Sequence, residues 1–279
     1  MPGRKRIYVT GAGGALGAAL AGHLGAVAVT RAAGEMPAAG WFDAADAGAV
    51  IVHAAGVSTA VADSDAAALA RPHLELFAAL AGRGWRGRAV LLSSAAVYGE
   101  ADRLPVPEIA AIRPVNPYGA QKALVEAGLA ALGRDAGFAV AVLRLANVYG
   151  TPRDLQRRRV IALLLDAALN GTPFTTYGDG TSLRDYLHVA DLCRAVSLAS
   201  AAEPAVLNLG SGTGTSLNAL IAAVEAATGR RLDRRRGEVR AEAASSVLDI
   251  SRAQDLLGWR PEVTLAEGLR RFLDSGAFA

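Results

Sequence analysis

Short apolar runs alternate with longer segments of helical periodicity through the first two-thirds of the chain. The apolar runs predict strands at residues 6–10, 26–30, 49–53, 89–93 and 139–145. The periodic segments predict helices at residues 15–24, 66–81 and 118–134. Strands that alternate with helices form parallel sheets with right-handed crossovers, so we expect a doubly wound α/β fold with helices on both faces.

The alternation is weaker in two regions. Residues 30–49 are few and rich in Ala, Gly and Asp, which predicts that one strand–helix unit is shortened there. After Gly150, prolines and glycines separate shorter segments, with helices expected at 189–199 and 216–228 and a strand at 205–209. We therefore expect residues 1–150, joined by 183–209, to form the parallel-sheet domain, and 151–182 with 210–279 to form a smaller lobe.

Composition supports a large, ordered core. Of the 279 residues 52% are hydrophobic and 20% are charged, which excludes an intrinsically disordered chain. Cys193 is the single cysteine, so a disulfide framework and a thiol-rich metal site are excluded, and we expect no metal. The apolar start of the chain is too short for a signal segment, and no apolar run is long enough to span a bilayer. We expect a cytoplasmic protein.

Arginine dominates the basic residues, since only Lys5 and Lys122 of the 29 are lysines. The arginine runs at 157–159 and 234–236 favour solvated faces, with a contact to an anionic diphosphate as the second interpretation. The runs lack interleaved aromatic residues and the net charge is only +3, so we expect no nucleic-acid partner.

A glycine turn follows the first predicted strand and opens the first predicted helix. Glycines three apart allow a tight turn, and they let a diphosphate approach the backbone at a helix N-terminus. A glycine-rich turn without a ligand is the alternative. The candidate dinucleotide-binding residues are Gly11, Gly14, Ala15, Leu16 and Gly17.

The residues at the end of the second predicted strand help to distinguish NADP from NAD as the cofactor. Dinucleotide folds often carry an acidic residue there for the adenine ribose, whereas this chain has Thr30 and Arg31. An arginine can pair with a 2′-phosphate, so Arg31 favours NADP, with NAD as the alternative.

Tyr118 and Lys122 lie four residues apart at the start of a predicted helix and so share one face. A lysine in a chain that otherwise uses arginine suggests that a compact ammonium is needed, placed to lower a phenol pKa. Ser94 ends the fourth strand, where a hydroxyl can hold a substrate oxygen while Tyr118 exchanges its proton. Ser93 competes with Ser94 for this role.

With these motifs, the chain resembles an extended short-chain dehydrogenase/reductase of the nucleotide-sugar epimerase/dehydratase type, which has a Rossmann-type sheet and a C-terminal substrate-binding lobe. The segments that carry the resemblance are residues 10–17, 53–56, 93–99, 116–122, 143–150, 177–180, 184–189 and 257–261. The resemblance implies a catalytic triad of Ser94, Tyr118 and Lys122, in which Lys122 binds the nicotinamide ribose and lowers the pKa of Tyr118.

The resemblance also implies ligand contacts outside the triad. His53, Ala54 and Ala55 match the segment that passes under the cofactor, although His53 can equally be a packed residue at the strand end. Asn147 and Arg184 would meet the phosphates of the nucleotide sugar, with Arg240 as the further basic residue. We expect structural roles for His188 and Cys193.

Departures from the family pattern narrow the reaction. Dehydratases carry Asp-Glu where this chain has Ala95 and Ala96, so 4,6-dehydration is disfavoured. Arg31 departs from NAD-retaining epimerases, which favours an NADPH-dependent reductase of a keto-sugar such as a nucleotide-linked 4-keto-6-deoxyhexose. The alternatives are a 4-epimerase with bound NAD and a cofactor-binding regulatory protein without turnover.

A homodimer is the expected assembly, because such proteins often pair through the helix that bears the catalytic tyrosine. The small-residue face suited to close packing comprises Ala123, Leu124, Ala127, Ala130 and Ala131.

Overall fold

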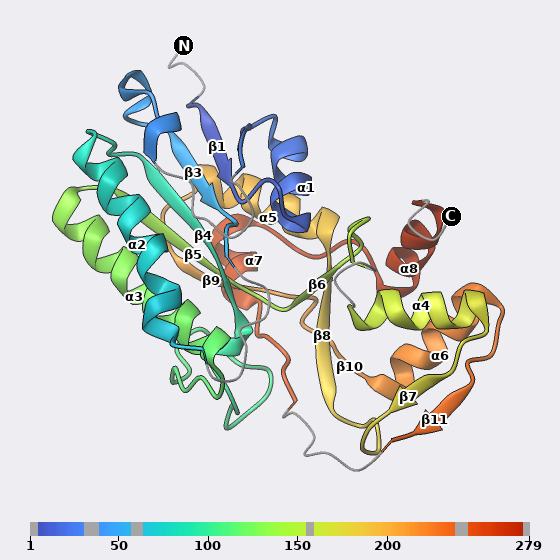
Figure 1. The fold of residues 1–279 in the computed structure, drawn as a ribbon. Helices are drawn as coiled ribbons and strands as arrows, with labels where there is room; N and C mark the ends of the chain where they lie inside the picture. The colour runs from blue at the N-terminus through green and yellow to red at the C-terminus, as the bar shows by residue number, and fades with distance from the viewer. Residues whose placement is uncertain (1–4, 31–38, 57–63, 155–158, 238–244, 276–279) are drawn as a thin grey trace.

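Six parallel strands form the central sheet, in the order β2-β1-β3-β4-β5-β9 (Figure 1). The computed structural model describes residues 5–30, 39–56, 64–154, 159–237 and 245–275. The strands are β1 (Ile7–Thr10), β2 (Val27–Val29), β3 (Val50–His53), β4 (Arg88–Ser94), β5 (Ala139–Leu145) and β9 (Val206–Leu209). All six point the same way, so their carboxyl ends lie along one edge of the sheet.

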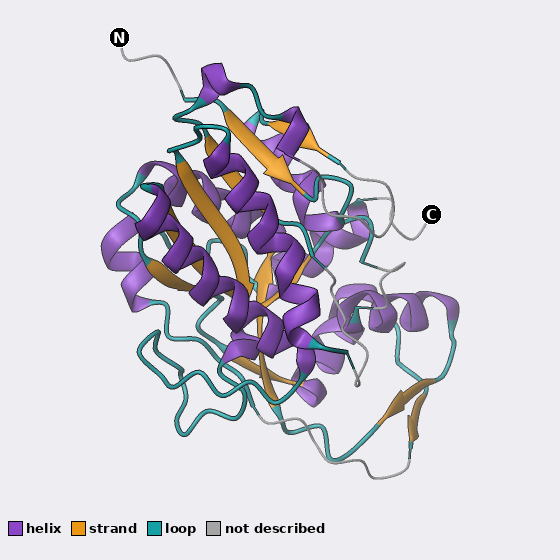
Figure 2. Cartoon of the chain, turned by 60° about the vertical axis from the view of Figure 1, so that its left-hand side comes forward, coloured by secondary structure: helices purple, strands orange, loops and turns teal. Residues whose placement is uncertain are grey.

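Helices cover both faces of this sheet. Helices α2 (Ala66–Gly82) and α3 (Pro117–Ala136) lie on one face (Figure 2), and α1 (Ala15–Leu24), α5 (Val189–Ala201) and α7 (Ser251–Leu257) lie on the other. Successive strand residues point to opposite faces. Val9 therefore packs in the cluster under α1 and α5, whereas Tyr8 packs in the cluster under α2. The predicted doubly wound parallel sheet is confirmed.

The shortened unit is confirmed for the part that the structure describes. Between β2 and β3, residues 39–49 hold two single-turn 3-10 helices, η1 (Ala39–Trp41) and η2 (Ala44–Asp46). Trp41 and Phe42 pack their rings near Tyr8 and close this end of the sheet. A strand–helix unit has no room in so few residues.

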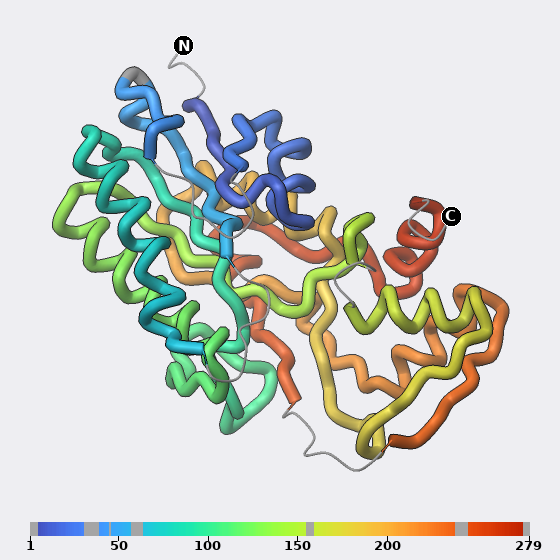
Figure 3. The backbone as a smooth tube through the Cα atoms, viewed as in Figure 1, coloured from blue at the N-terminus to red at the C-terminus, as the bar shows by residue number. Residues whose placement is uncertain are grey.

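The rest of the chain builds a second group of elements (Figure 3). Its helices are α4 (Val160–Asn170), α6 (Leu217–Thr228) and α8 (Leu265–Asp274), which share a separate hydrophobic core. Strands β6 (Asn147–Tyr149), β8 (Leu183–His188) and β10 (Gly214–Ser216) form a three-stranded sheet, and β7 (Phe174–Thr176) pairs with β11 (Arg234–Arg236). Of the stretch 183–209, only β9 joins the six-stranded sheet, and β8 joins β6 and β10 instead.

Candidate active site

The glycine turn between β1 and α1 forms a cradle that larger residues would fill. A Cβ on Gly11, which has a φ of 75°, would lie 2.6 Å from the Ala55 Cα, and a Cβ on Gly17 would lie 2.2 Å from the Gly11 carbonyl oxygen. Helix α1 follows Gly14, and no side chain of the described residues caps it. The free N–H groups of its first turn suit a diphosphate, so the residues present fit a dinucleotide cofactor.

Arg153 brings a second element to this turn. Its guanidinium donates to the Gly13 carbonyl across the gap between the turn after β6 and the glycine turn. The Asp154 carboxylate holds the Arg153 turn by accepting from the backbone N–H groups of Gly150 at 2.8 Å and Thr151 at 3.1 Å. Arg153 was not among the residues predicted from the sequence. Its position directly after the 143–150 motif was the available signal.

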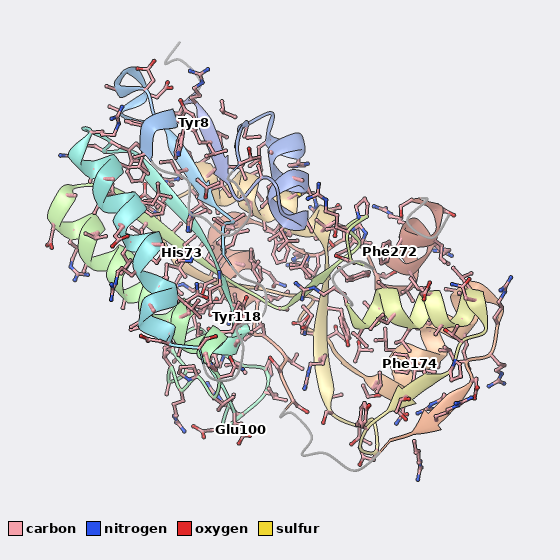
Figure 4. All side chains as sticks on the ribbon, viewed as in Figure 1. Tyr8, His73, Glu100, Tyr118, Phe174 and Phe272 are labelled. Carbon is pink, nitrogen blue, oxygen red and sulfur yellow. The ribbon has the colours of Figure 1, made fainter. Side chains whose placement is uncertain are left out.

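The start of α3 is fixed beside the end of β4. The Asn116 side chain caps the helix by accepting from the Gly119 N–H at 2.8 Å, and Pro117 occupies the first helical position. A Cβ on Gly119 would lie 2.4 Å from the Ala96 carbonyl oxygen, so only glycine permits this close approach. Tyr118, which Figure 4 labels at the start of α3, is thereby held within hydrogen-bonding reach of Ser94.

The three triad candidates come together in the structure. The Lys122 ammonium lies 5.9 Å from the centre of the Tyr118 ring and donates to the Leu92 carbonyl at 2.9 Å. Burial lowers the pKa of Lys122 to about 8, and the negative charge of Glu126 opposes this shift. Burial raises the pKa of Tyr118, whereas the hydrogen bond with Ser94 and the positive charge of Arg159 lower it. The groups that favour the phenolate are therefore Ser94 and Arg159, because the Lys122 ammonium is turned toward Leu92.

Ser93 and Ser94 face different partners. Ser93 is buried and donates to the Glu126 carboxylate, whereas Ser94 faces Tyr118 and accepts from the Ala96 N–H at 3.2 Å. The alternation of side chains along β4 separates the two hydroxyls. The geometry thus favours Ser94 over Ser93 as the hydroxyl that meets a substrate.

Glu126 lies one helical turn after Lys122 and forms a buried ion pair with Arg144 on β5. The pair has a shortest distance of 2.7 Å, and both side chains are at least nine-tenths buried. Arg144 also donates to the Tyr98 hydroxyl at 3.0 Å, and that hydroxyl donates to the Asn208 side chain at 2.7 Å. This network ties α3, β5 and β9 together behind the triad. It was not predicted from the sequence, because its four residues lie on four separate segments of the chain.

The candidate substrate residues lie on the smaller sheet. Asn147 pairs in register with Tyr186, so Asn147 and Arg184 share one face of the sheet. The Asn147 amide donates to the Asp185 carbonyl at 3.1 Å. The buried Asp185 carboxylate accepts from the Ser211 N–H at 2.6 Å and from the Gly212 N–H at 3.2 Å, which fixes β8 in place.

The structure describes some of the remaining candidate residues but not all of them. Arg31 and Arg240 lie outside the described residues. His53 is fully buried at the end of β3, and Ala54 donates its N–H to the Thr10 carbonyl at 3.1 Å. The His188 side chain caps α5, and Cys193 is a buried core residue with no disulfide.

The described part of the chain shows neither a metal-binding cluster nor a membrane-spanning helix. No three His, Cys, Asp or Glu side chains gather there in a metal-binding arrangement. None of the described helices combines the length and apolar character that crossing a membrane requires.

Relatives among known proteins align with about two thirds of this chain. A putative UDP-glucose 4-epimerase from Methanocaldococcus jannaschii is 35% identical over 188 residues, which are 65% of this chain and 60% of that protein. A dTDP-4-dehydro-6-deoxyglucose reductase from Escherichia coli is 30% identical over 187 residues, which are 66% of this chain and 59% of that protein. These alignments therefore span less than two thirds of either relative's length.

Solved structures share the fold over nearly the whole chain. MoeE5 in complex with UDP-glucose and NAD is 28% identical with a TM-score of 0.82, covering 96% of this chain and 97% of that one. RMD from Pseudomonas aeruginosa, complexed with NADPH, is 26% identical with a TM-score of 0.81, covering 97% of this chain and 98% of that one. A model of the NAD dependent epimerase/dehydratase family matches residues 7–210, and the chain belongs to that family.

Proposed function

We propose that this protein is an NAD(P)-dependent oxidoreductase that acts at a ring carbon of a nucleotide-linked sugar. The observation that carries the proposal is the Tyr118 phenol beside Ser94, with the Lys122 ammonium over its ring. The glycine turn, whose backbone fits a diphosphate, belongs to the same carboxyl edge of the sheet.

The chain's own residues would move one proton. A bound nicotinamide cofactor supplies or accepts the hydride. Ser94 would hold the reacting oxygen of the sugar by a hydrogen bond. Tyr118 would give its proton to that oxygen when a ketone becomes an alcohol, and would take it back in the reverse direction. The Ser94 hydrogen bond and the positive charge of Arg159 would favour the phenolate that remains after the proton has left, and Lys122 would bind the nicotinamide ribose.

Two reactions use this constellation, and each has a supporting observation. Reduction of a nucleotide-linked keto-sugar, such as a 4-keto-6-deoxyhexose, is supported by Arg31 and by the reductase relative from Escherichia coli. Epimerisation at C4 is supported by the UDP-glucose 4-epimerase relatives. Elimination of water is disfavoured, because the two residues after Ser94 are Ala95 and Ala96 and carry no acid or base.

The nucleotide held by the purified protein tests the proposal. We would denature the protein, identify any nucleotide that it releases, and titrate NADPH and NADH into the emptied protein. Near-stoichiometric NAD is expected for the epimerase, which restores its cofactor within each turnover. An empty site that prefers NADPH is expected for the reductase. A protein that binds neither nucleotide would contradict the proposed function.

We further propose that residues 151–182 and 210–279, apart from the stretch around α7 that packs on the six-stranded sheet, form the substrate-binding lobe. Asn147 and Arg184 share a face of the β10-β8-β6 sheet and would contact the sugar-nucleotide phosphates. Arg240 is the further basic residue proposed for this contact. The exposed run at 234–236 would remain solvated, with no nucleic-acid partner.

A homodimer through α2 and α3 is the proposed assembly. Leu124 is 44% exposed on α3, and Ala127 beside it is also exposed, so an apolar strip is available for a second copy. Leu124→Glu is expected to shift the protein from dimer to monomer, because the burial of one new negative charge from each of the two chains at the interface would be unfavourable. Light scattering measures the mass. A monomeric wild-type protein would refute the proposal, and Leu256→Glu, at an exposed position on α7, is the control.

A further inference from the structure

Four buried side chains form a continuous chain of hydrogen bonds beside the site. The Thr10 hydroxyl lies 2.7 Å from His53 Nδ1, and His53 Nε2 lies 2.7 Å from His73 Nδ1. His73 Nε2 in turn lies 2.9 Å from the Gln121 amide nitrogen. This hydrogen-bond chain therefore links β1, β3, α2 and α3. His73 is labelled on α2 in Figure 4.

The direction of these bonds follows from Gln121. Its amide nitrogen also donates to the Leu69 carbonyl at 3.2 Å, so it is a donor toward His73 Nε2 as well. His73 then carries its proton on Nδ1 and donates to His53 Nε2. His53 carries its proton on Nδ1 and donates to Thr10. Both rings are neutral in this arrangement, with one proton each.

This hydrogen-bond chain reaches two parts of the proposed site, the glycine cradle after β1 and the start of α3. Thr10 immediately precedes Gly11 of the cradle, and Gln121 immediately precedes Lys122 on α3. A Cβ on Gly56 would lie 3.4 Å from His73 Cε1 and 3.7 Å from Lys122 Nζ, so the imidazole and the ammonium flank the same backbone segment. An amide donates a hydrogen bond without passing a proton on, so the chain is a fixed link and not a proton path.

The surroundings oppose a charge on the His53 ring. Burial lowers the pKa of His53 well below its usual range, and His73 and Lys122 lower it further. The Phe77 ring packs against His53 with 5.2 Å between centres, and the charged neighbours of His73 on α2, Arg71 and Glu75, are exposed. Below a pH of about 6.5, a histidine in the unfolded chain binds a proton, whereas the buried His53 ring stays neutral. The free energy of unfolding therefore falls as the pH drops below that value.

A proton on His73 would break the link. Its Nε2–H would then face the Gln121 amide donors, and its positive charge would approach Lys122. The Gln121 oxygen has no hydrogen-bond partner among the described residues, so the amide could rotate to accept from the charged ring. That rotation would remove the bond to Leu69 and with it a polar contact between α2 and α3 next to Lys122.

We propose that His73 is a positioning residue that holds the Tyr118–Lys122 turn of α3 against the glycine cradle, through Gln121 and His53, only while both imidazoles are neutral. The kinetic part of this inference rests on the proposed function. The protonation states and the nucleotide affinity can be measured without it.

Nitrogen-15 NMR of the histidine rings tests the link directly. We expect His53 and His73 to be neutral and protonated on Nδ1 at a pH of about 7, and His53 to remain so at about 5.5, below the ordinary histidine value. A proton on Nε2 of either neutral ring at the higher pH would overturn the inference.

Two substitutions of His73 separate positioning from packing. His73→Gln keeps an acceptor for Gln121 and a donor for His53 but cannot be protonated, whereas His73→Leu keeps volume and removes both bonds. We expect His73→Leu to lower kcat/KM and weaken nicotinamide-nucleotide binding by about tenfold, and His73→Gln to restore most of both. His73→Gln should also move the acid limb of the pH profile to lower pH.

The matched control is His23→Gln on the exposed end of α1, which should leave the pH profile unchanged. An acid limb that is the same in wild type and His73→Gln, or equal nucleotide affinities in wild type and His73→Leu, would overturn the inference. If no nucleotide sugar turns over at all, the proposed function fails, while the NMR and affinity measurements still decide the role of His73.

Discussion

Tyr118→Phe is expected to lower kcat by roughly a hundredfold to ten-thousandfold, the range that loss of a positioned acid or base produces. The substitution keeps the ring against which Lys122 lies at 5.9 Å and removes only the hydroxyl that meets Ser94. Folding and nucleotide binding should therefore change little. The measurement is kcat with UDP-glucose for epimerisation and with dTDP-4-dehydro-6-deoxyglucose for reduction.

Tyr8→Phe is the matched control for the loss of a phenol. The Tyr8 hydroxyl donates to Asp46 near the amino edge of the sheet, whereas the cradle lies at the carboxyl edge, and its ring is buried. We expect Tyr8→Phe to lower the free energy of unfolding by about 1 kcal/mol and to leave kcat unchanged. A Tyr118→Phe protein that retains kcat within tenfold of wild type would assign the proton transfer to another group.

Glu126→Ala is expected to lower the free energy of unfolding by about 3–5 kcal/mol, because it leaves the Arg144 guanidinium buried without its counter-charge. Glu126 accepts from Arg144 Nη2 at 2.7 Å and from Arg144 Nε at 3.1 Å, and it also accepts from the Ser93 hydroxyl. Its removal would loosen the end of β4 and the start of α3 together. Urea-induced unfolding measures the free energy.

Asp102→Ala removes an ion pair of similar length in a different environment. The Arg113–Asp102 distance is 2.8 Å, but these side chains are 59% and 76% exposed. Water and salt screen such a pair, so we expect a loss below about 1 kcal/mol. Equal losses for Glu126→Ala and Asp102→Ala would show that the buried network contributes no more than a surface contact.

Glu126→Gln keeps the shape of the side chain and isolates the charge. Burial lowers the pKa of Lys122 to about 8, and the negative charge of Glu126 opposes this shift. Without the carboxylate, the ammonium should lose its proton at lower pH. The basic limb of the kcat/KM profile should move in that direction if the ammonium is the active form.

The sequence by itself determined the parallel sheet, because runs such as 49–53 and 139–145 are apolar on both faces and only a sheet covered by helices on both sides buries them. It also determined the glycine cradle and the Tyr118–Lys122 pair, since a turn and a helix face depend on residues close together in the chain. Helix α4 was missed although its signal was local, since Val160–Asn170 is an apolar run interrupted by Asp166 and ending at Asn170.

Only the tertiary structure decided which buried polar groups meet. The spacing of Thr10, His53, His73 and Gln121 along the chain predicts no contact, and the bonds form because parallel strands align their ends under α2 and α3. The same alignment separated Ser94 from Ser93 and turned the Lys122 ammonium toward Leu92. Local patterns fix local geometry, whereas contacts between distant segments depend on how the layers pack, and no short sequence pattern records that packing.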